Sequence, residues 1–267
     1  MCLSLPVTVP CRPMSDPDRP TILILGGTAE AAGLAQAVVV RWGARVRVIT
    51  SLAGRTQAPA GVAGEVRTGG FGGVGPMATY LETMTVRAVI DATHPFAAQI
   101  SRNAQQACDQ VNTPRLVLDR PPWNPVEGDQ WHMVPDMSAA AAELPRRGRR
   151  AFLTVGRTEL AVFAGCSDTW FLARLIDPPS EPLSLRDYHV IVDRGPFSVA
   201  GETALLKRHE IDIVVCKASG GEMTYAKLAA ARAIGCPVLM VARPPLPEGD
   251  RVSSIDGVVG WLSNLLT

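Results

Sequence analysis

Long hydrophobic runs are missing from this sequence, although 47% of its 267 residues are hydrophobic. None approaches the roughly eighteen apolar residues that a helix needs to cross a membrane. An excess of charge of one sign is missing too, because the formal net charge is only +1, and this argues against a nucleic-acid partner. With few aromatic residues, the composition fits a soluble enzyme of two modest domains, without a membrane or nucleic-acid partner.

Paired cysteines and metal-binding spacings are also missing. The six cysteines lie far apart without a C-x-x-C pair, and Cys108 and Cys216 fall in apolar segments. We therefore expect reduced, mostly structural thiols in a cytoplasmic protein. The four histidines are scattered without H-x-x-x-H or paired Cys/His spacing, so no metal site is predicted.

Residues Thr21–Gly33 read TILILGGTAEAAG, an apolar strand-like run followed by a glycine pair and an alanine-rich helical stretch. This order places a phosphate at a helix N-terminus, where unpaired N–H groups and the helix dipole favour an anion. Gly26 and Gly27 allow the backbone to pass close to a pyrophosphate, and Thr28 offers a hydroxyl. The glycines do not match G-x-G-x-x-G, so a simple tight turn is the alternative.

The second expected strand, Arg45–Ile49, is not followed by the acidic residue that usually binds the ribose 2′-hydroxyl of NAD. Ser51 and Arg55 stand there instead, and a hydroxyl with a guanidinium suits a 2′-phosphate. The pattern favours NADPH over NADH. The alternative is a polar loop with a solvated arginine.

Short apolar strands alternate with alanine-rich helices along the chain, the pattern of parallel sheets covered by helices on both faces. We expect two Rossmann-like α/β domains. Residues 21–118 would bind the nucleotide, the Pro- and Trp-rich segment 119–135 would be a linker, and 136–267 would form the second domain. Residues 1–20 resemble neither a signal peptide nor a structured element, and we expect a loose tail. Whether the C-terminal end packs on the first or the second domain stays open.

Ligands of open α/β sheets gather beyond the carboxyl ends of the strands, and polar residues follow several expected strands here. Asp91, Thr93 and His94 follow one of them, and a histidine there can orient a nicotinamide or donate a proton. Its alternative is to cap the next helix or to satisfy a loop carbonyl. In the second half, the sequence Lys217-Ala-Ser219-Gly-Gly221 before a helix predicts a second anion cradle.

Seven ordered motifs together resemble the precorrin-6A reductase family and cover nearly all of the chain from Thr21 to about Pro245. They are GGTAEA (26–31), SLAGR (51–55), GGFGG (69–73), DATHPFA (91–97), VGRTEL (155–160), RGPF (194–197) and KASGG (217–221). The resemblance implies NADPH-dependent reduction of a double bond of the precorrin-6A macrocycle to give precorrin-6B in cobalamin biosynthesis. It also implies two α/β domains with the active site in the cleft between them, and it makes neighbouring enzymes of the pathway candidate partners.

The candidate site residues follow from the motifs and from the chemistry of the implied substrate, which carries many carboxylates. Arg157, Arg174, Arg194 and Lys217 are the candidate substrate-binding residues, and His94, Asp91 and Lys217 the candidate catalytic residues. The candidate cofactor-binding residues are Gly26, Gly27, Thr28, Glu30, Ser51, Arg55, Gly70, Thr93, Ser219, Gly220 and Gly221.

The sequence is also compatible in part with three other functions. A short-chain dehydrogenase needs a Tyr-x-x-x-Lys pair, but Ala229 stands four residues after Tyr225 and Met84 four after Tyr80. A non-catalytic NADP-sensing module would keep the nucleotide loop, and the many polar loops of the second half argue against it. The cobalt-precorrin-6A reductases of the anaerobic route carry similar motifs, so the resemblance leaves that alternative open.

Overall fold

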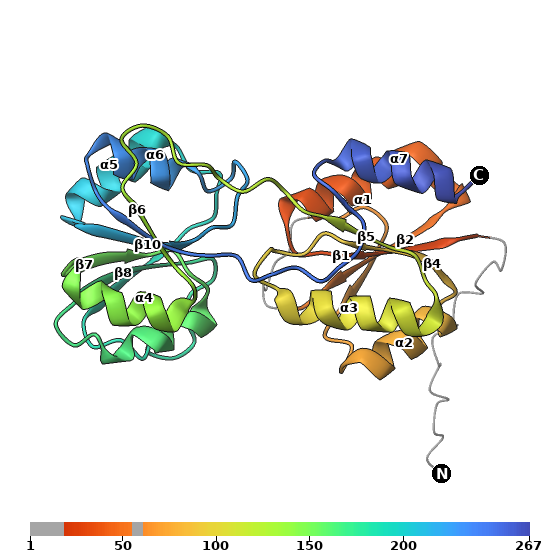
Figure 1. Cartoon of the computed structure of the whole chain (residues 1–267), viewed down its shortest axis with the longest axis horizontal. Helices are drawn as coiled ribbons and strands as arrows, with labels where there is room; N and C mark the ends of the chain where they lie inside the picture. The colour runs from red at the N-terminus through yellow and green to blue at the C-terminus, as the bar shows by residue number, and fades with distance from the viewer. Residues whose placement is uncertain (1–18, 55–60) are drawn as a thin grey trace, which may run out of the picture.

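The computed structural model describes residues 19–54 and 61–267 and shows two α/β domains, each built on a six-stranded sheet (Figure 1). All of the recorded strand pairs are parallel. The expected α/β class with two Rossmann-like domains is therefore confirmed. Most of the expected tail and the candidate residue Arg55 lie outside the described residues.

The first sheet has the strand order β12-β5-β4-β1-β2-β3. Its elements are β1 (Thr21–Leu25), α1 (Ala29–Trp42), a 3-10 turn (Gly43–Arg45), β2 (Arg47–Leu52), β3 (Glu65–Thr68), α2 (Val74–Thr83), β4 (Val86–Asp91), α3 (Ala98–Val111), β5 (Arg115–Leu118), β12 (Arg251–Val252) and α7 (Ile255–Leu265).

The second sheet has the order β6-β11-β10-β7-β8-β9. Its elements are β6 (Trp131–Val134), α4 (Met137–Glu143), a 3-10 turn (Leu144–Arg146), β7 (Arg150–Leu153), the 3-10 helix η3 (Arg157–Gly165), β8 (Trp170–Leu175), β9 (Tyr188–Val192), α5 (Val199–Arg208), β10 (Ile213–Lys217), α6 (Ala226–Ala233) and β11 (Val238–Val241).

Strand β1 shows why the apolar run TILIL becomes a central strand. All five of its residues are buried. Ile22 and Ile24 belong to the core cluster that includes residues of α1 and α7, whereas Leu23 and Leu25 belong to the cluster that includes residues of α2 and α3. Alternate side chains of a strand point to opposite faces, so a strand covered by helices on both faces needs a continuous apolar run.

The C-terminal end packs on the first domain, which settles the placement that the sequence left open. Strand β12 pairs with β5, and Val258 and Leu262 of α7 are fully buried beside α1. Gly33 allows this contact, because a Cβ added there would lie 3.2 Å from Cδ1 of Ile255. The second domain therefore ends near residue 241 rather than at 267.

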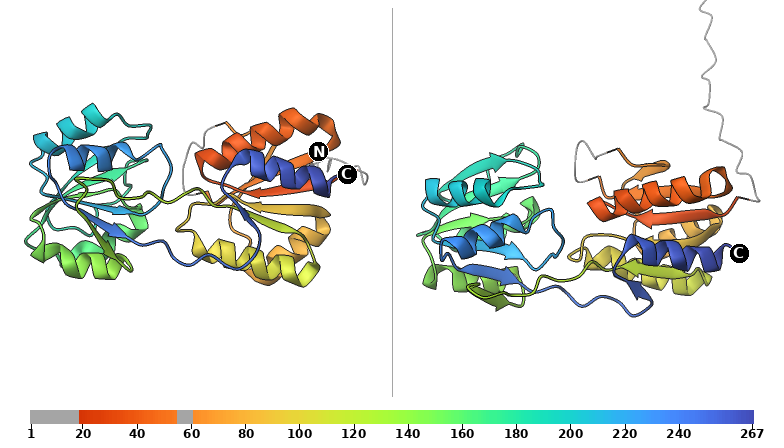
Figure 2. Two further views of the ribbon diagram at one scale, coloured as in Figure 1. Left: turned by 45° about the horizontal axis from the view of Figure 1, so that its top comes forward. Right: turned by 90° about the horizontal axis from the view of Figure 1, so that it is seen from above.

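The expected linker 119–135 is shorter in the structure, because its last part forms β6 and pairs with β11. The chain thus passes between the domains twice, first through residues 119–130 and then through residues 242–250. We call these the first and second crossing segments. Figure 2 shows both segments running along the same side of the molecule.

The four cysteines of the described segments are buried and unpaired. Within residues 19–54 and 61–267, no helix is long and apolar enough to cross a membrane, and no group of three or more His, Cys, Asp or Glu could hold a metal ion.

The packing of α7 predicts that Leu262→Ala destabilises the first domain by about 2–5 kcal/mol, because it removes a fully buried side chain and leaves a cavity. Urea unfolding followed by far-UV circular dichroism measures the change. The control is Val40→Ala on the exposed side of α1, where 72% of the residue is accessible and we expect a change within about 0.5 kcal/mol. Equal effects of both substitutions would contradict the assignment of α7 to this core.

Candidate active site

The loop after β1 has the geometry of a nucleotide-binding turn. The N–H of Gly26 donates to the carbonyl of Ser51 over 2.9 Å, and a Cβ on Gly26 would lie only 2.8 Å from Cγ2 of Thr50. Gly27 has φ +106°, and no atom lies within 4 Å of the position that its Cβ would take. The backbone is thus open to a ligand at the N-terminus of α1, in a conformation that favours glycine.

Thr28 has a structural role in the turn. Its hydroxyl accepts a hydrogen bond from the N–H of Ala31 and donates one of 2.8 Å to the carbonyl of Ala92. It therefore caps α1 and ties the turn to the end of β4. Since the hydroxyl proton is already donated to Ala92, the hydroxyl in this structure is engaged within the protein, and its role as a cofactor ligand stays a prediction.

Ser51 meets an arginine that the sequence analysis missed. Strands β2 and β3 pair so that Ser51 lies opposite Arg67, and Nη1 of Arg67 donates to Oγ of Ser51 over 2.9 Å. The same guanidinium donates to the carbonyls of Gly69 and Gly70 and lies 3.8 Å from the ring centre of Phe71. The arginine that stands two residues before GGFGG was the available signal, but the register of β3 against β2 could not be derived from the sequence.

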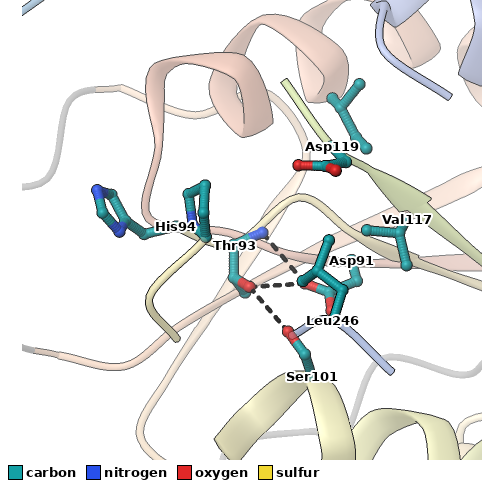
Figure 3. Close-up of a pocket in the computed structure, with 9 residues that line it drawn as sticks. Asp91, Thr93, His94, Ser101, Val117, Asp119 and Leu246 are labelled. Carbon is teal, nitrogen blue, oxygen red and sulfur yellow. Dashed lines mark hydrogen bonds between the residues drawn. The ribbon is translucent and has the colours of Figure 1, made fainter. Parts of the chain in front are cut away.

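Asp91 and Thr93 form a small buried network at the end of β4 (Figure 3). Oδ1 of Asp91 accepts from the N–H and the hydroxyl of Thr93, at 3.2 and 2.7 Å, and that hydroxyl lies 3.4 Å from Oγ of Ser101. Oδ2 of Asp91 is buried without a hydrogen-bond partner among the described residues. The adjacent cavity of about 10 Å³, which Asp119 and Leu246 also line, has room for roughly one water molecule.

His94 follows this network and points away from it in Figure 3. Its Nδ1 accepts a hydrogen bond of 3.2 Å from the N–H of Phe96, which assigns the ring proton to Nε2. Burial is the largest cause that lowers the pKa of His94, and together with the charges of four cations it brings the pKa to about 3; the cations are Arg120, Lys217, Arg243 and Lys227. The imidazole is therefore neutral near pH 7. The sequence suggested a proton donor active near neutrality, and an imidazolium in that role does not fit this environment.

Phe96 and Lys217 join the two domains beside His94. Phe96 packs against a core cluster of the second domain, and Nζ of Lys217 lies 5.0 Å from its ring centre. Lys217 also pairs with Glu159 of η3 at 2.5 Å. No role for Phe96 could be predicted, because a phenylalanine that follows a strand in the sequence gives no sign that it packs against another domain.

The cradle Ser219–Gly221 lies against both crossing segments. The carbonyl of Ser219 accepts hydrogen bonds of 2.8 Å from Nε of Arg120 and from Nη2 of Arg243. The carbonyl of Gly221 accepts one from Nε1 of Trp123 at 2.8 Å. Gly220 has φ +68°, and a side chain there would collide with the Pro121 carbonyl and the guanidinium of Arg243.

The candidate substrate-binding arginines of the second domain do not lie in equivalent places. Arg157 is exposed and donates to Oγ of Ser180 at 3.1 Å, and Arg194 is exposed in the loop after β9. The prediction for Arg174 is corrected by its environment. Its side chain is 8% exposed, and its two terminal nitrogens bind the carboxylate of Glu202 at 2.6 and 2.9 Å. Arg174 is thus half of a buried ion pair.

The loops at the carboxyl ends of both sheets meet at the interdomain junction. A Cβ on Gly221, after β10, would lie 3.3 Å from Oε1 of Glu30, after β1. Two parallel sheets, with a Gly-Gly turn before a helix on one and a cationic loop on the other, define a two-domain α/β protein of the Rossmann type, a class in which ligands bind beyond the carboxyl ends of the strands.

Comparisons with known proteins identify the enzyme class. Residues 21–263 match the family model "Precorrin-6x reductase CbiJ/CobK". The chain is 48% identical to a precorrin-6A reductase of Rhodococcus erythropolis, over 91% of this chain and 98% of the relative. It is 31% identical to a cobalt-precorrin-6A reductase of Salmonella typhimurium, over 86% and 90%.

Among solved structures, the chain matches "CobK precorrin-6A reductase" with a TM-score of 0.87 and 43% identity, over 92% of this chain and 97% of that chain. The chain belongs to the precorrin-6x reductase CbiJ/CobK family. It is therefore an oxidoreductase of cobalamin biosynthesis, which excludes the non-catalytic sensing module and the short-chain dehydrogenase.

The environment of His94 predicts a loss of stability in acid. Its pKa is lower in the folded chain (about 3) than in the unfolded chain (about 6.5), so the unfolded state binds more protons in between. This contribution to stability is complete above pH 6.5 and is lost as the pH falls towards 3. When the pH falls from about 7.5 to 5.5, the free energy of unfolding of the unmodified protein should decrease. For His94→Gln we expect this decrease to be smaller by on the order of 1 kcal/mol. Urea unfolding at both pH values measures this, and parallel losses would contradict the low pKa.

Proposed function

We propose that this protein is an NADPH-dependent reductase of metal-free precorrin-6A, which reduces one double bond of the macrocycle and yields precorrin-6B. The observation that carries the proposal is the junction, where the open Gly-Gly turn of the first domain faces the Lys217 loop of the second. The names of the relatives give the reaction, and the residues at the junction are suited to an anionic cofactor and an anionic substrate.

The residues of the first domain fit NADPH in two places. The turn at Gly26 and Gly27 leaves space beside the backbone where a diphosphate could approach the N-terminus of α1. Ser51 with Arg67 supplies a hydroxyl and a guanidinium where the 2′-phosphate is expected, and Arg55 follows Ser51 closely in the sequence. Bound NADPH would supply the hydride. The protein would position the nicotinamide against the macrocycle and supply or relay the proton.

His94 is a neutral N–H donor in this proposal. Because Nδ1 is occupied by the Phe96 N–H, the Nε2–H can donate to a ligand at the junction. It orients that ligand by a hydrogen bond instead of acting as an acid of pKa near 7. Lys217, beside it, provides a positive charge held by Glu159, and Asp91 keeps Thr93 and the turn before His94 in place.

Substrate recognition in this proposal rests on exposed cations at the carboxyl end of the second sheet. Arg157 begins η3 after β7, Arg194 lies in the loop after β9, and both are suited to carboxylate side chains of a macrocycle. Arg174 is left out, because its charge is already neutralised by Glu202 in a buried pair.

The pairing of Ser51 with Arg67 predicts the cofactor preference. Arg67→Ala should weaken NADPH binding about ten- to a hundredfold, or 1.5–3 kcal/mol, and leave NADH binding nearly unchanged, because only NADPH carries the 2′-phosphate. Arg55→Ala should act in the same direction. Fluorescence titration of both cofactors gives the affinities, and the exposed Arg87→Ala on β4 is the control. Equal losses for the two cofactors would refute this role of Arg67.

The higher identity to the precorrin-6A reductase than to the cobalt-precorrin-6A reductase, 48% against 31%, favours the metal-free macrocycle. Anaerobic mixing of the purified protein with NADPH and either macrocycle, followed at the cofactor absorbance band, tests this. We expect turnover of metal-free precorrin-6A at least about tenfold faster, which corresponds to 1.4 kcal/mol in the barrier. Faster oxidation of NADPH with the cobalt-bearing macrocycle would reverse the assignment.

A further inference from the structure

Arg120 lies at the point where the nucleotide loop, the first crossing segment and the Ser219–Gly221 cradle meet. It stands two residues after β5, and its Nη1 lies 3.0 and 3.1 Å from the two carboxylate oxygens of Glu30, in the first turn of α1. Its Nε donates to the carbonyl of Ser219. The Arg120 side chain is 16% exposed, so one nearly buried guanidinium contacts both domains.

Glu30 carries its carboxylate in the first turn of α1, close to the helix N-terminus where a diphosphate is expected to bind. Burial is the largest effect on the pKa of Glu30 and raises it, but the hydrogen bonds from Arg120 and from the backbone N–H of Glu30, with the charge of Arg120, outweigh burial and lower the pKa overall. Glu30 is therefore ionised at neutral pH. A diphosphate at the N-terminus of α1 would bring further negative charge close to it, and like charges repel.

Arg120 can relieve this repulsion and keep its hydrogen bond to Ser219 of the second domain. Its Nη2 makes no hydrogen bond within residues 19–54 and 61–267, whereas Nε and Nη1 are in use. Guanidinium groups bind phosphate oxygens through two parallel N–H groups. Turning the Nη1/Nη2 edge from the carboxylate to a phosphate would keep the Nε bond to Ser219.

We propose that Arg120 is a diphosphate-binding residue supplied by the first crossing segment, and that Glu30 holds it in place until the cofactor arrives. This inference rests on the proposed use of NADPH. Because Arg120 stays bound to Ser219, the occupied cofactor site is connected directly to the cradle that follows Lys217. Glu30, predicted from the sequence as a cofactor ligand, becomes the competitor of the cofactor for Arg120.

The proposal predicts effects of opposite sign at the two ends of one ion pair. Arg120→Ala should weaken NADP⁺ binding about ten- to a hundredfold, because a phosphate partner is lost. Glu30→Gln should strengthen binding about three- to tenfold, because the competing negative charge is removed. A purely structural bridge between the domains would give a loss of affinity, or no change, in both variants.

Calorimetric titration with NADP⁺ measures these affinities without turnover, and displacement by adenosine 2′-monophosphate provides a probe that lacks the diphosphate. We expect Arg120→Ala to affect NADP⁺ but not the monophosphate, whereas Arg67→Ala should affect both. Arg146→Ala, an exposed arginine paired with Glu143, is the control and should change neither. Thermal melting establishes that each variant is folded, and Arg120→Lys, which keeps the charge but not the fork, replaces Arg120→Ala if that variant does not fold.

Unchanged NADP⁺ affinity in a folded Arg120 variant would overturn the inference, and so would weaker binding by Glu30→Gln. Both outcomes leave the proposed reductase function intact as long as the unmodified protein binds NADP⁺. Failure of the unmodified protein to bind NADP⁺ would instead refute the proposed cofactor, and the role of Arg120 with it.

Discussion

The hydrogen bonds to the carbonyl of Ser219 determine how the two domains are joined. Arg120 comes from the first crossing segment and Arg243 from the second, and both donate to this one oxygen at 2.8 Å. Arg243 also donates to the carbonyls of Ala218 and Arg120 and to the carboxylate of Asp119. The loop after β10 is thereby fixed to both connections, and its position relative to β1 and β4 follows from these contacts.

The charges at the junction favour anionic ligands. Arg120, Arg243, Lys217 and the buried Lys227 all act on His94, and their combined field helps to keep its imidazole neutral. Arg174 differs from these cations, because it is paired with a buried carboxylate inside the second domain. Its carboxylate partner Glu202 is almost fully buried, so the charge of Arg174 is already neutralised inside the domain, and removing one partner would leave a buried charge.

The sequence predicted the parts of the site that depend on local order along the chain. The turn at Gly26 and Gly27 and the polar ends of β4 and β10 follow from a strand, a break and a helix in succession, and the structure has all three. Their assignment as ligands stays a prediction. Arg67, Arg120 and Arg243 were missed because their roles depend on strand register and on which loops meet across the domains. A single sequence contains no pattern from which those distances can be read.

The same limit explains the errors at the domain boundaries. The four residues of β6 follow a Pro- and Trp-rich stretch, and only their pairing with β11 shows that they are a strand. The two residues of β12 carry too little periodicity to be recognised, yet their pairing with β5 returns the chain to the first sheet. Both strands sit at the edges of their sheets, where tertiary pairing rather than local propensity decides the structure.

That return of the chain has a mechanical consequence. Two domains joined by one linker can rotate about several axes, whereas two connections on the same side of the molecule restrict the motion mainly to bending about the line between them. The loops after β1, β4 and β10 lie at the junction where such bending would change distances. A bound ligand that contacts both domains would therefore change mainly one distance, the separation of the two facing sheet edges. The ring of Phe96 packs against the second domain beside Lys217, and this contact keeps the two sheet edges close together.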